Sequence, residues 1–390
     1  MTFDTPIDHT GTHSQKWDTL EKVYGLKPDE GLAMWVADMD FRPPQVVQQA
    51  LEKMLAHGMY GYFGDDRAYL DAICWWMQTR HGWEVAPEWI FTTHGLVNGL
   101  ALCVHSFTKP GDSVIVMTPV YHAFARILKA TGREVLECPL TVQDGKAQMD
   151  FATWEASLTG REKMLILCSP HNPGGRVWTV AELRAVADFC VKHDLILISD
   201  EIHHDLVYPG QKHTVMPNAA PEITDRLVMM TSTAKTFNLA GAKTGNVIIA
   251  SPALRNAFAA TMSAMGMEAN AFGKHMVTAA YSSEGAAWVD DLMNYMDANR
   301  RVFDEGINRI PGLHSTQLEA TYLAWVDFSG TGMTKAEFID RVQNVAKIAT
   351  NLGSSFGTGG ESYLRFNLAC PRAQIVEAVA RMERAFADLQ

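Results

Sequence analysis

Three polar segments in the middle of the chain carry residue types that could form a chemical site. They read SPHNPGG, SDEIH and TSTAK, and they contain Asn172, Asp200 and Lys235. Each follows a short aliphatic run of the kind that is typical of buried parallel strands. Ligands of such sheets bind beyond the carboxyl ends of the strands. We therefore expect the amide, the carboxylate and the amine to meet in one cleft.

These three groups match the needs of pyridoxal phosphate, a cofactor with an aldehyde, a phenolate oxygen and a ring nitrogen. An amine captures the aldehyde, an amide polarises the phenolate oxygen, and a carboxylate keeps the ring nitrogen protonated. A charged neighbour typically shifts a pKa by about 1–3 units, which is enough to hold a pyridine protonated at neutral pH. A protonated ring can then accept electrons from a substrate.

At these segments the chain resembles the fold-type I pyridoxal phosphate enzymes of the class I/II aminotransferase family. The resemblance implies that Lys235 binds the cofactor aldehyde covalently, that Asp200 pairs with the pyridinium nitrogen and that Asn172 hydrogen-bonds the ring hydroxyl oxygen. Ser232 falls where the family places a phosphate ligand. The function implied is therefore that of an enzyme with pyridoxal 5'-phosphate as its cofactor.

Composition agrees with a globular enzyme and argues against several other classes. A chain of 390 residues suggests two or three domains, and 47% hydrophobic with 20% charged residues is typical of a soluble protein. The net charge of −11 argues against nucleic acid or an anionic membrane as the main partner. We therefore expect a small-molecule partner, with no nucleic acid and no membrane.

The ends of the chain and its cysteines favour the cytoplasm. No apolar run approaches the roughly 20 residues of a membrane span, and the first residues, MTFDTP, lack the pattern of a signal peptide. The six cysteines are scattered without a CxxC pair, which favours reduced thiols over a disulfide scaffold or a zinc site.

The segment MWVADMDFRPP, residues 34–44, precedes an expected helix from Gln45 to His57. It resembles the opening of one branch of the family, the MalY/PatB-type cystathionine β-lyases or cysteine C–S lyases. In that branch the segment lies along the substrate pocket, which makes Ala37 and Asp38 candidates for contacts with the amino acid. From the residues alone, Asp38 or Asp40 would cap the following helix. Both interpretations stay open.

A glycine-punctuated loop at 58–64 carries Tyr60 and Tyr62. Taken alone it predicts a turn with two half-buried aromatic rings. Similar enzymes place the tyrosine that matches Tyr62 on the phosphate of the neighbouring subunit's cofactor. The resemblance therefore implies a homodimer with shared active sites.

Two further strand ends are expected to contribute to cofactor binding. A turn at 93–98 opens a helix, where free N–H groups favour an anion, and the family uses Gly95, Leu96 and Val97 for the phosphate. The segment TPVYHAF, residues 118–124, follows another buried strand. An aromatic ring there suits offset stacking on a flat heterocycle, and in related lyases the residue that matches Tyr121 stacks on the pyridine.

Two lysines compete for the covalent role, because Lys243 lies eight residues after Lys235. Only Lys235 has a serine three residues before it and a strand immediately upstream. Lys243 occupies a position where many aminotransferases place a phosphate-binding arginine, so it is a candidate phosphate contact. His203 is expected to orient Asp200 from the "DEIH" position. Metal binding by His203 and His204 is not expected, because no third ligand sits at zinc spacing.

The carboxyl-terminal part alternates helices with three expected strands, at 320–327, 345–349 and 363–368, and ends in a helix over 374–389. Arg365 carries a guanidinium that matches a carboxylate, and the family uses the arginine of this LRFNLA segment to hold the substrate α-carboxylate. Tyr322 begins a segment shared with the lyase branch and is expected to edge the pocket. Arg372 is expected to be a solvated residue at a helix start.

The predicted fold class is α/β: a large domain whose mostly parallel sheet is flanked by helices, plus a smaller α+β domain formed by both termini. The expected boundaries are 1–45 for an N-terminal arm and part of the small domain, 46–285 for the large cofactor-binding domain, and 286–390 for the C-terminal small domain.

Loss of the substrate's α-proton to Lys235 would allow two outcomes with the same residues. Either a thiolate leaves the β-carbon, or the amino group stays on the cofactor. Resemblance to the C–S lyase branch favours β-elimination from cystathionine or another S-substituted cysteine, giving a thiol, pyruvate and ammonia. An aminotransferase that uses a 2-oxo acid is the alternative, and a cofactor-binding regulatory protein that acts through a protein partner is a second one.

Overall fold

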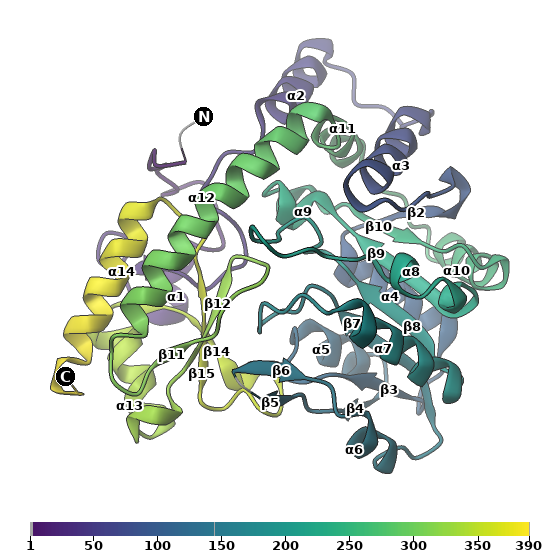
Figure 1. The fold of residues 1–390 in the computed structure, drawn as a ribbon. Coiled ribbons are helices and arrows are strands. Elements are labelled where there is room, and N and C mark those ends of the chain that lie inside the picture. Colours follow the sequence, from purple (N-terminus) through teal and green to yellow (C-terminus); the bar gives the residue numbers. More distant parts are fainter. Residues whose placement is uncertain (1–2, 144, 390) are drawn as a thin grey trace.

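A seven-stranded sheet forms the centre of the molecule, and the polar segments of interest lie at one of its edges. The computed structural model describes residues 3–143 and 145–389. Figure 1 shows the sheet on one side, with a smaller layer of strands and helices on the other. Both chain termini belong to the smaller part.

The large sheet is mostly parallel. Its strand order is β2-β10-β9-β8-β7-β3-β4, and β10 is antiparallel to both of its neighbours. The other neighbouring pairs are parallel. The bounds are β2 Ile90–Thr93, β3 Ser113–Val116, β4 Glu134–Glu137, β7 Glu162–Cys168, β8 Ile196–Asp200, β9 Leu227–Thr231 and β10 Gly245–Ile248.

Helices cover both faces of this sheet, which explains why its strands are continuous apolar runs. Val114 and Val116 of β3 pack into a cluster with α4 and α10, whereas Ile115 between them faces the main core on the other side. The helices of the large part are α2 Gln45–His57, α3 Arg67–His81, α4 Leu96–Phe107, α5 Ala123–Ala130, α6 Phe151–Ala156, α7 Val180–Lys192, α8 Met216–Ala219, α9 Thr233–Thr236, α10 Pro252–Ala264 and α11 Ala271–Ala280.

The smaller part combines an antiparallel sheet with two packed helices. The sheet order is β11-β12-β15-β14, with β11 His314–Ser315, β12 Leu323–Asp327, β14 Asn351–Leu352 and β15 Tyr363–Asn367. Helices α12 Ser283–Ile307 and α14 Arg372–Ala385 lie side by side along it (Figure 1). Helix α13 spans Lys335–Asp340, and α1 spans Leu20–Tyr24 in the N-terminal arm.

Both termini contribute to the smaller part. Strand β1, Leu32–Ala33, pairs in parallel with β13, Ile348–Ala349. The predicted fold class is therefore confirmed. We propose to retain the boundaries at residues 45 and 285, because α12 begins at Ser283 and leads from the large part into the small one (Figure 1).

Three local predictions in the C-terminal region are wrong. The strand expected over 345–349 is limited to 348–349, because a helical segment continues from Arg341 to Val345 and a positive φ at Lys347 ends it. The closing helix ends at Ala385, before a short 3₁₀ turn over 387–389. Arg372 starts that helix, but it is not simply solvated: its Nε donates to Asn299 Oδ1 at 3.1 Å.

Two hairpin strands, β5 Thr141–Gln143 and β6 Lys146–Gln148, were not predicted. They are largely polar and exposed, so they lack the apolar runs on which strand prediction depends. All six cysteines are free thiols. Within 3–143 and 145–389, no helix is both long and apolar enough to cross a membrane.

Candidate active site

The strand ends bring the predicted amide, carboxylate and amine to one edge of the sheet. Strands β7, β8 and β9 run in parallel, and Cys168, Asp200 and Met230 are aligned in register at their carboxyl ends. Asn172 follows β7, Asp200 ends β8, and Lys235 lies in α9 directly after β9. The charges of Asp200 and Lys235 interact across this edge. The predicted amide, carboxylate and amine are therefore brought to the same edge of the sheet.

Lys235 projects from a very short helix whose start is fixed by Ser232. The Ser232 hydroxyl accepts a hydrogen bond from the Ala234 N–H at 3.1 Å and donates to the Thr244 carbonyl at 2.7 Å. The Lys235 ammonium donates to the Ala37 carbonyl at 2.5 Å. Burial lowers the pKa of Lys235 to about 8, although the Asp38 charge opposes this effect. An amine of this kind can give up its proton near neutral pH.

Asp200 is buried, and its environment pushes the carboxyl towards the neutral form. Burial raises its pKa to about 7, and the neighbouring Glu201 adds to the effect. The Ile202 N–H donates to Oδ1 at 3.2 Å, which favours the charged form, as does Lys235. A cationic group placed against this carboxylate would favour its ionised state further.

Arg365 lies in the centre of β15 and points back towards the large sheet. Its Nη1 donates to Asn172 Oδ1 at 2.8 Å, and its Nη2 donates to Asn351 Oδ1 at 2.5 Å. The guanidinium stacks over the Phe356 ring, 4.9 Å from the centroid. Burial lowers its pKa to about 10. Nε is buried and has no partner among the described residues. A substrate carboxylate has donors available here.

Residues 36–41 form an extended segment, here called the strap, that lies across the Lys235 amine. Asn238, just after α9, accepts from the Met39 N–H and donates to the Met39 and Phe41 carbonyls, all at 2.9 Å. Asn367 donates to the carbonyls at either side of Ala37, at 2.6 and 2.5 Å. Tyr322 also donates to the Ala37 carbonyl, at 3.1 Å. The strap is therefore tied to both domains.

Within the strap, Asp38 and Asp40 have different surroundings. Asp40 is paired with the fully buried Lys16 at 2.9 Å. The Oδ1 atom of Asp38 has no hydrogen-bond partner among the described residues, and burial raises the pKa of this carboxyl. The alternative that one of them caps α2 is wrong, because the N-cap residue of α2 is Pro44. Ala37 and Asp38 both lie beside Lys235, through the Ala37 carbonyl and the charge of Asp38.

The residues predicted to bind the cofactor phosphate are less closely grouped than Asn172, Asp200 and Lys235. Gly95 has φ 79° and is the N-cap residue of α4, so Leu96 and Val97 form the first turn of that helix. Lys243, in a left-handed conformation with φ 49°, is exposed and lines one pocket together with His94. Its charge lowers the pKa of Lys235. The Ser232 hydroxyl is already occupied within the chain.

Three further predicted residues, Tyr62, His203 and Tyr121, differ in their surroundings. Tyr62 is fully exposed, at 101% of its reference surface, so its ring is not packed into a site of its own chain. His203 Nδ1 has no partner among the described residues, so the bond by which it was to orient Asp200 is not present. Tyr121 is half-buried, and its phenol lies close enough to Asp200 and Arg365 for their charges to affect its pKa.

Sequence reasoning missed the asparagines that organise the site. Asn238, Asn351 and Asn367 bind the strap or Arg365, and only Asn367 lies in a segment that the sequence singled out, LRFNLA. Asn238 follows Lys235 closely, and Asn367 lies two residues after Arg365. An asparagine close in sequence to a predicted reactive residue is the signal that was available.

The parallel sheet and the lysine at its edge define a fold-type I pyridoxal phosphate architecture. The model of the family "aminotransferase class I and II" matches residues 33–382. The chain belongs to this family.

Individual relatives point to one branch of it. The cystathionine beta-lyase PatB of Bacillus subtilis is 37% identical over 388 residues, which cover 99% of this chain and 100% of that protein. Cystalysin from Treponema denticola, solved with pyridoxal 5'-phosphate, has a TM-score of 0.95 at 35% identity and covers 100% of this chain and 99% of its own. A pyridoxal phosphate-bound C–S lyase from Staphylococcus hominis has a TM-score of 0.91 at 28% identity, covering 99% and 98%.

Proposed function

We propose that this protein is a pyridoxal 5'-phosphate-dependent carbon–sulfur lyase. Its substrate would be cystathionine or another S-substituted cysteine, and its products a thiol, pyruvate and ammonia. The observation that carries the proposal is the partly buried Lys235 amine, whose pKa is lowered to about 8 and which lies close enough to Asp200 and Arg365 for their charges to act on it. The names of PatB and of the Staphylococcus hominis enzyme favour elimination at a carbon–sulfur bond.

The residues of the cleft fit the cofactor. Buried polar atoms of Asp38, His203 and Arg365 have no partner among the described residues, which is a costly arrangement unless a ligand satisfies some of them. We assign the aldehyde to Lys235 and the ring nitrogen to Asp200. The remaining proposed cofactor contacts are Asn172, Tyr121, His203, Ser232, Lys243 and the first turn of α4 at Gly95, Leu96 and Val97.

When bound, pyridoxal phosphate supplies a protonated ring that takes up the electron pair released at the substrate's α-carbon. Arg365 holds the α-carboxylate through its guanidinium, and Tyr322, Ala37 and Asp38 border the same space. The Lys235 amine, once neutral, removes the α-proton as a general base and retains it at Nζ. Cleavage of the Cβ–S bond then releases the thiolate. Asp200 would stabilise the positive charge of the protonated ring nitrogen.

A pyruvate assay on the purified holoenzyme tests this function. Cystathionine and an S-alkyl cysteine are each supplied without any 2-oxo acid, and thiol and pyruvate are measured together. Equal amounts of both products are expected. Strict dependence of turnover on an added 2-oxo acid would instead identify an aminotransferase. Lys235→Ala is the negative control, and Lys129→Ala, at an exposed position of α5, is the matched lysine variant that retains the amine at 235.

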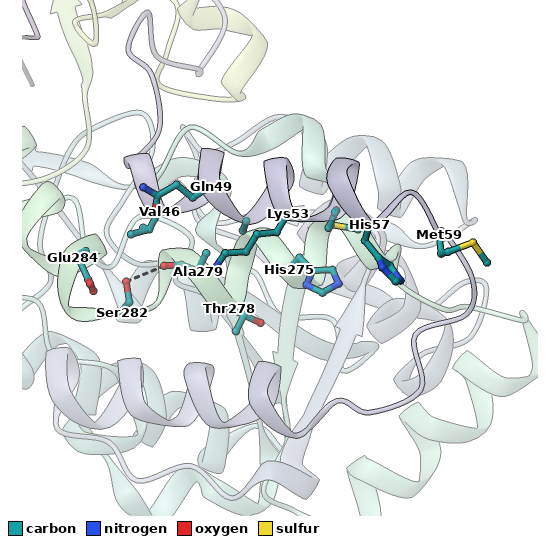
Figure 2. Close-up of a pocket in the computed structure, with 12 residues that line it drawn as sticks. Val46, Gln49, Lys53, His57, Met59, His275, Thr278, Ala279, Ser282 and Glu284 are labelled. Carbon is teal, nitrogen blue, oxygen red and sulfur yellow. Dashed lines mark hydrogen bonds between the residues drawn. The ribbon is translucent and has the colours of Figure 1, made fainter.

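We also infer a homodimer in which each subunit completes the other's site. Tyr62 is fully exposed beside other exposed apolar side chains, namely Leu55, Met59, Tyr60 and Phe272. A pocket of about 530 Å³ lies next to them between α2 and α11, lined by residues that include Lys53, His57 and His275 (Figure 2). It contains none of the predicted site residues. Such a face is suited to a second copy of the chain. The free thiols favour the cytoplasm as its location.

Co-expression of two inactive variants tests the shared site. Tyr62→Ala and Lys235→Ala subunits are combined, so that each hybrid dimer contains one site with both residues intact. Because random pairing makes half of the dimers hybrid, roughly a quarter of wild-type activity should return. A mixture no more active than its separate components would contradict the contribution of Tyr62 across the interface.

A further inference from the structure

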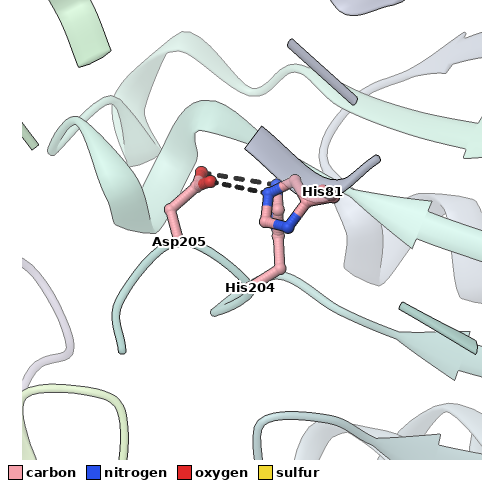
Figure 3. A group of neighbouring side chains, drawn as sticks. All are labelled: His81, His204 and Asp205. Atoms are coloured by element: carbon pink, nitrogen blue, oxygen red, sulfur yellow. Dashed lines mark hydrogen bonds and ion pairs between the residues drawn. The ribbon is translucent and has the colours of Figure 1, made fainter. Parts of the chain in front are cut away.

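Directly behind α9, away from the Lys235 amine, the buried carboxylate of Asp205 is surrounded by donors. Trp76 Nε1 donates to Oδ1 at 3.0 Å, and His81 Nε2 lies 2.9 Å from the same oxygen. The Thr236 hydroxyl donates to Oδ2 at 2.8 Å. His204 Nε2 lies 3.3 Å from Oδ2. Figure 3 shows the two histidines converging on the carboxylate. These five residues are here called the Asp205 network.

His204 lies against Asp205 without a hydrogen bond to it. Its Nδ1 lies 2.5 Å from the Glu201 carbonyl oxygen, which can only accept, so Nδ1 is a donor. Both side chains are fully buried, at 0% exposure. The Nε2 atom of His204 has no hydrogen-bond partner among the described residues, and burial lowers the pKa of His204 to about 4. The Asp205 carboxylate is therefore held mainly by Trp76, His81 and Thr236.

The same three groups, His81, His204 and Asp205, lie close enough together to hold a metal ion. The sequence interpretation missed this, because His81 comes from the end of α3, far away in the chain. The carboxylate, however, is already bonded at both oxygens, by Trp76 and His81 at Oδ1 and by Thr236 at Oδ2. A cation would have to displace them. Although burial opposes ionisation, His204, His81 and Thr236 hold the pKa of Asp205 below its usual range.

Thr236 connects this network to the reactive amine, since it is the residue after Lys235. Helix α9 has only four residues, Thr233–Thr236, so its own hydrogen bonds cannot hold it in place. Ser232 fixes its start, and Asn238 ties the residues after it to the strap. The hydrogen bond from Thr236 to Asp205 fixes the end of the helix against α3 and the loop after β8.

We propose that Asp205 is a positioning residue for Lys235, acting through the Thr236 hydroxyl. The inference rests on the proposed function, in which Lys235 is the reactive amine. A fixed α9 keeps the amine in its buried position against the strap. Loosening α9 would expose the amine to water and return its pKa towards the ordinary value of a lysine.

Thr236→Val is the variant that tests the proposal, because it removes the hydroxyl and keeps the side-chain volume. Thr236→Ser is the matched control that keeps the hydroxyl. In cofactor-free protein, an amine-reactive acylating reagent labels Lys235, and peptide mass spectrometry follows the rate against pH. We expect the midpoint to rise by at least half a pH unit in Thr236→Val and to stay near wild type in Thr236→Ser. In the holoenzyme, kcat should fall roughly 10-fold with KM changed less than twofold.

The outcomes separate this inference from the proposed function. A raised midpoint in Thr236→Val supports the positioning role even if the wild-type protein forms no pyruvate from S-substituted cysteines, which would overturn the lyase proposal alone. An unchanged midpoint, with only the melting temperature lowered, overturns the positioning role, because a purely structural bond would give that result. One equivalent of zinc per purified chain, lost in His204→Ala, would also overturn it by making Asp205 a metal ligand.

Discussion

The two sides of α9 are both buried and polar, but they differ in how completely their polar groups are satisfied. On the Lys235 side, atoms of Asp38, His203 and Arg365 have no partner among the described residues. On the other side, both oxygens of the Asp205 carboxylate are bonded, by Trp76, His81 and Thr236, and the unpartnered atom is His204 Nε2, 3.3 Å from the carboxylate. Unsatisfied buried groups cost about 1–3 kcal/mol each. The Lys235 side, here called the open side, can therefore bind a ligand. The Asp205 side, here called the closed side, holds α9 in place.

The pKa shifts follow the same division. Burial moves Lys235 and Asp200 towards their neutral forms, to about 8 and about 7. The pKa of Asp205 moves in the opposite direction, although it is equally buried, because its donors outweigh the loss of water. Burial alone therefore does not decide the charge of a group. Partners decide it, and a site that must exchange protons keeps its own partners few.

Replacing Lys235 removes the amine from the open side and should have the largest effect. We expect Lys235→Ala to lower kcat for β-elimination by roughly 10³-fold or more, since general bases contribute about 10²–10⁴-fold. The visible absorption of the holoenzyme should change with it. Lys129→Ala, which alters an exposed lysine of α5 that is none of the proposed contacts, is the control and should retain most of kcat. Comparable losses of kcat in both variants would contradict the assignment of Lys235 as the reactive amine.

Arg365 tests whether the open side binds a carboxylate. Hydrogen bonds to charged groups contribute about 1.5–3 kcal/mol, so Arg365→Gln should raise KM roughly 10- to 100-fold. Arg365→Lys keeps the charge but loses the planar pair of donors, and it should recover only part of the affinity. Steady-state kinetics with an S-alkyl cysteine measure both. An unchanged KM in Arg365→Gln would place the substrate carboxylate elsewhere.

Much of the fold followed from the sequence because both faces of the large sheet are covered. Strands such as β3 and β7 contain continuous apolar runs, and helix α7 begins at a capping box formed by Thr179 and Glu182. The hairpin β5–β6 was missed because its residues are polar and exposed. Residues 345–349 have an apolar alternation suited to a strand, but continuation of the preceding helix outweighs it.

Some residues of the site could be predicted from the local sequence, whereas others are brought together only by the fold. Lys235 and Asp200 stand at the ends of recognisable strands, so parallel-sheet geometry alone predicted that they meet. The partners of Asp205 come from α3, α9 and the loop after β8, and no spacing along the chain relates them. His203 failed for a related reason: its neighbourhood to Asp200 in sequence did not place its ring nitrogen against the carboxylate.

Asn238 tests the connection between α9 and the strap. Its side chain makes three hydrogen bonds to Met39 and Phe41, each with a net contribution of about 1 kcal/mol. Asn238→Ala should therefore lower the free energy of unfolding by about 3 kcal/mol and raise KM, as the strap bordering the site loosens. Chemical denaturation and steady-state kinetics measure these effects. The exposed Asn344, changed to Ala, is the control, and equal effects at both positions would contradict the role of the strap.

The smallest predicted effect is a pH dependence of stability in the cofactor-free protein. The folded-state pKa of Lys235 is about 8, below the ordinary value of 10.5. Between these values the unfolded chain holds a proton that the folded chain has released, so stability rises with pH in this window. The rise should be about 1 kcal/mol between pH 8 and pH 9. Lys235→Met removes the ammonium and should remove this part of the slope, as measured by denaturation at each pH. Parallel slopes in the two proteins would mean that the amine is hydrated, and the contrast between the open and closed sides of α9 would lose its electrostatic basis.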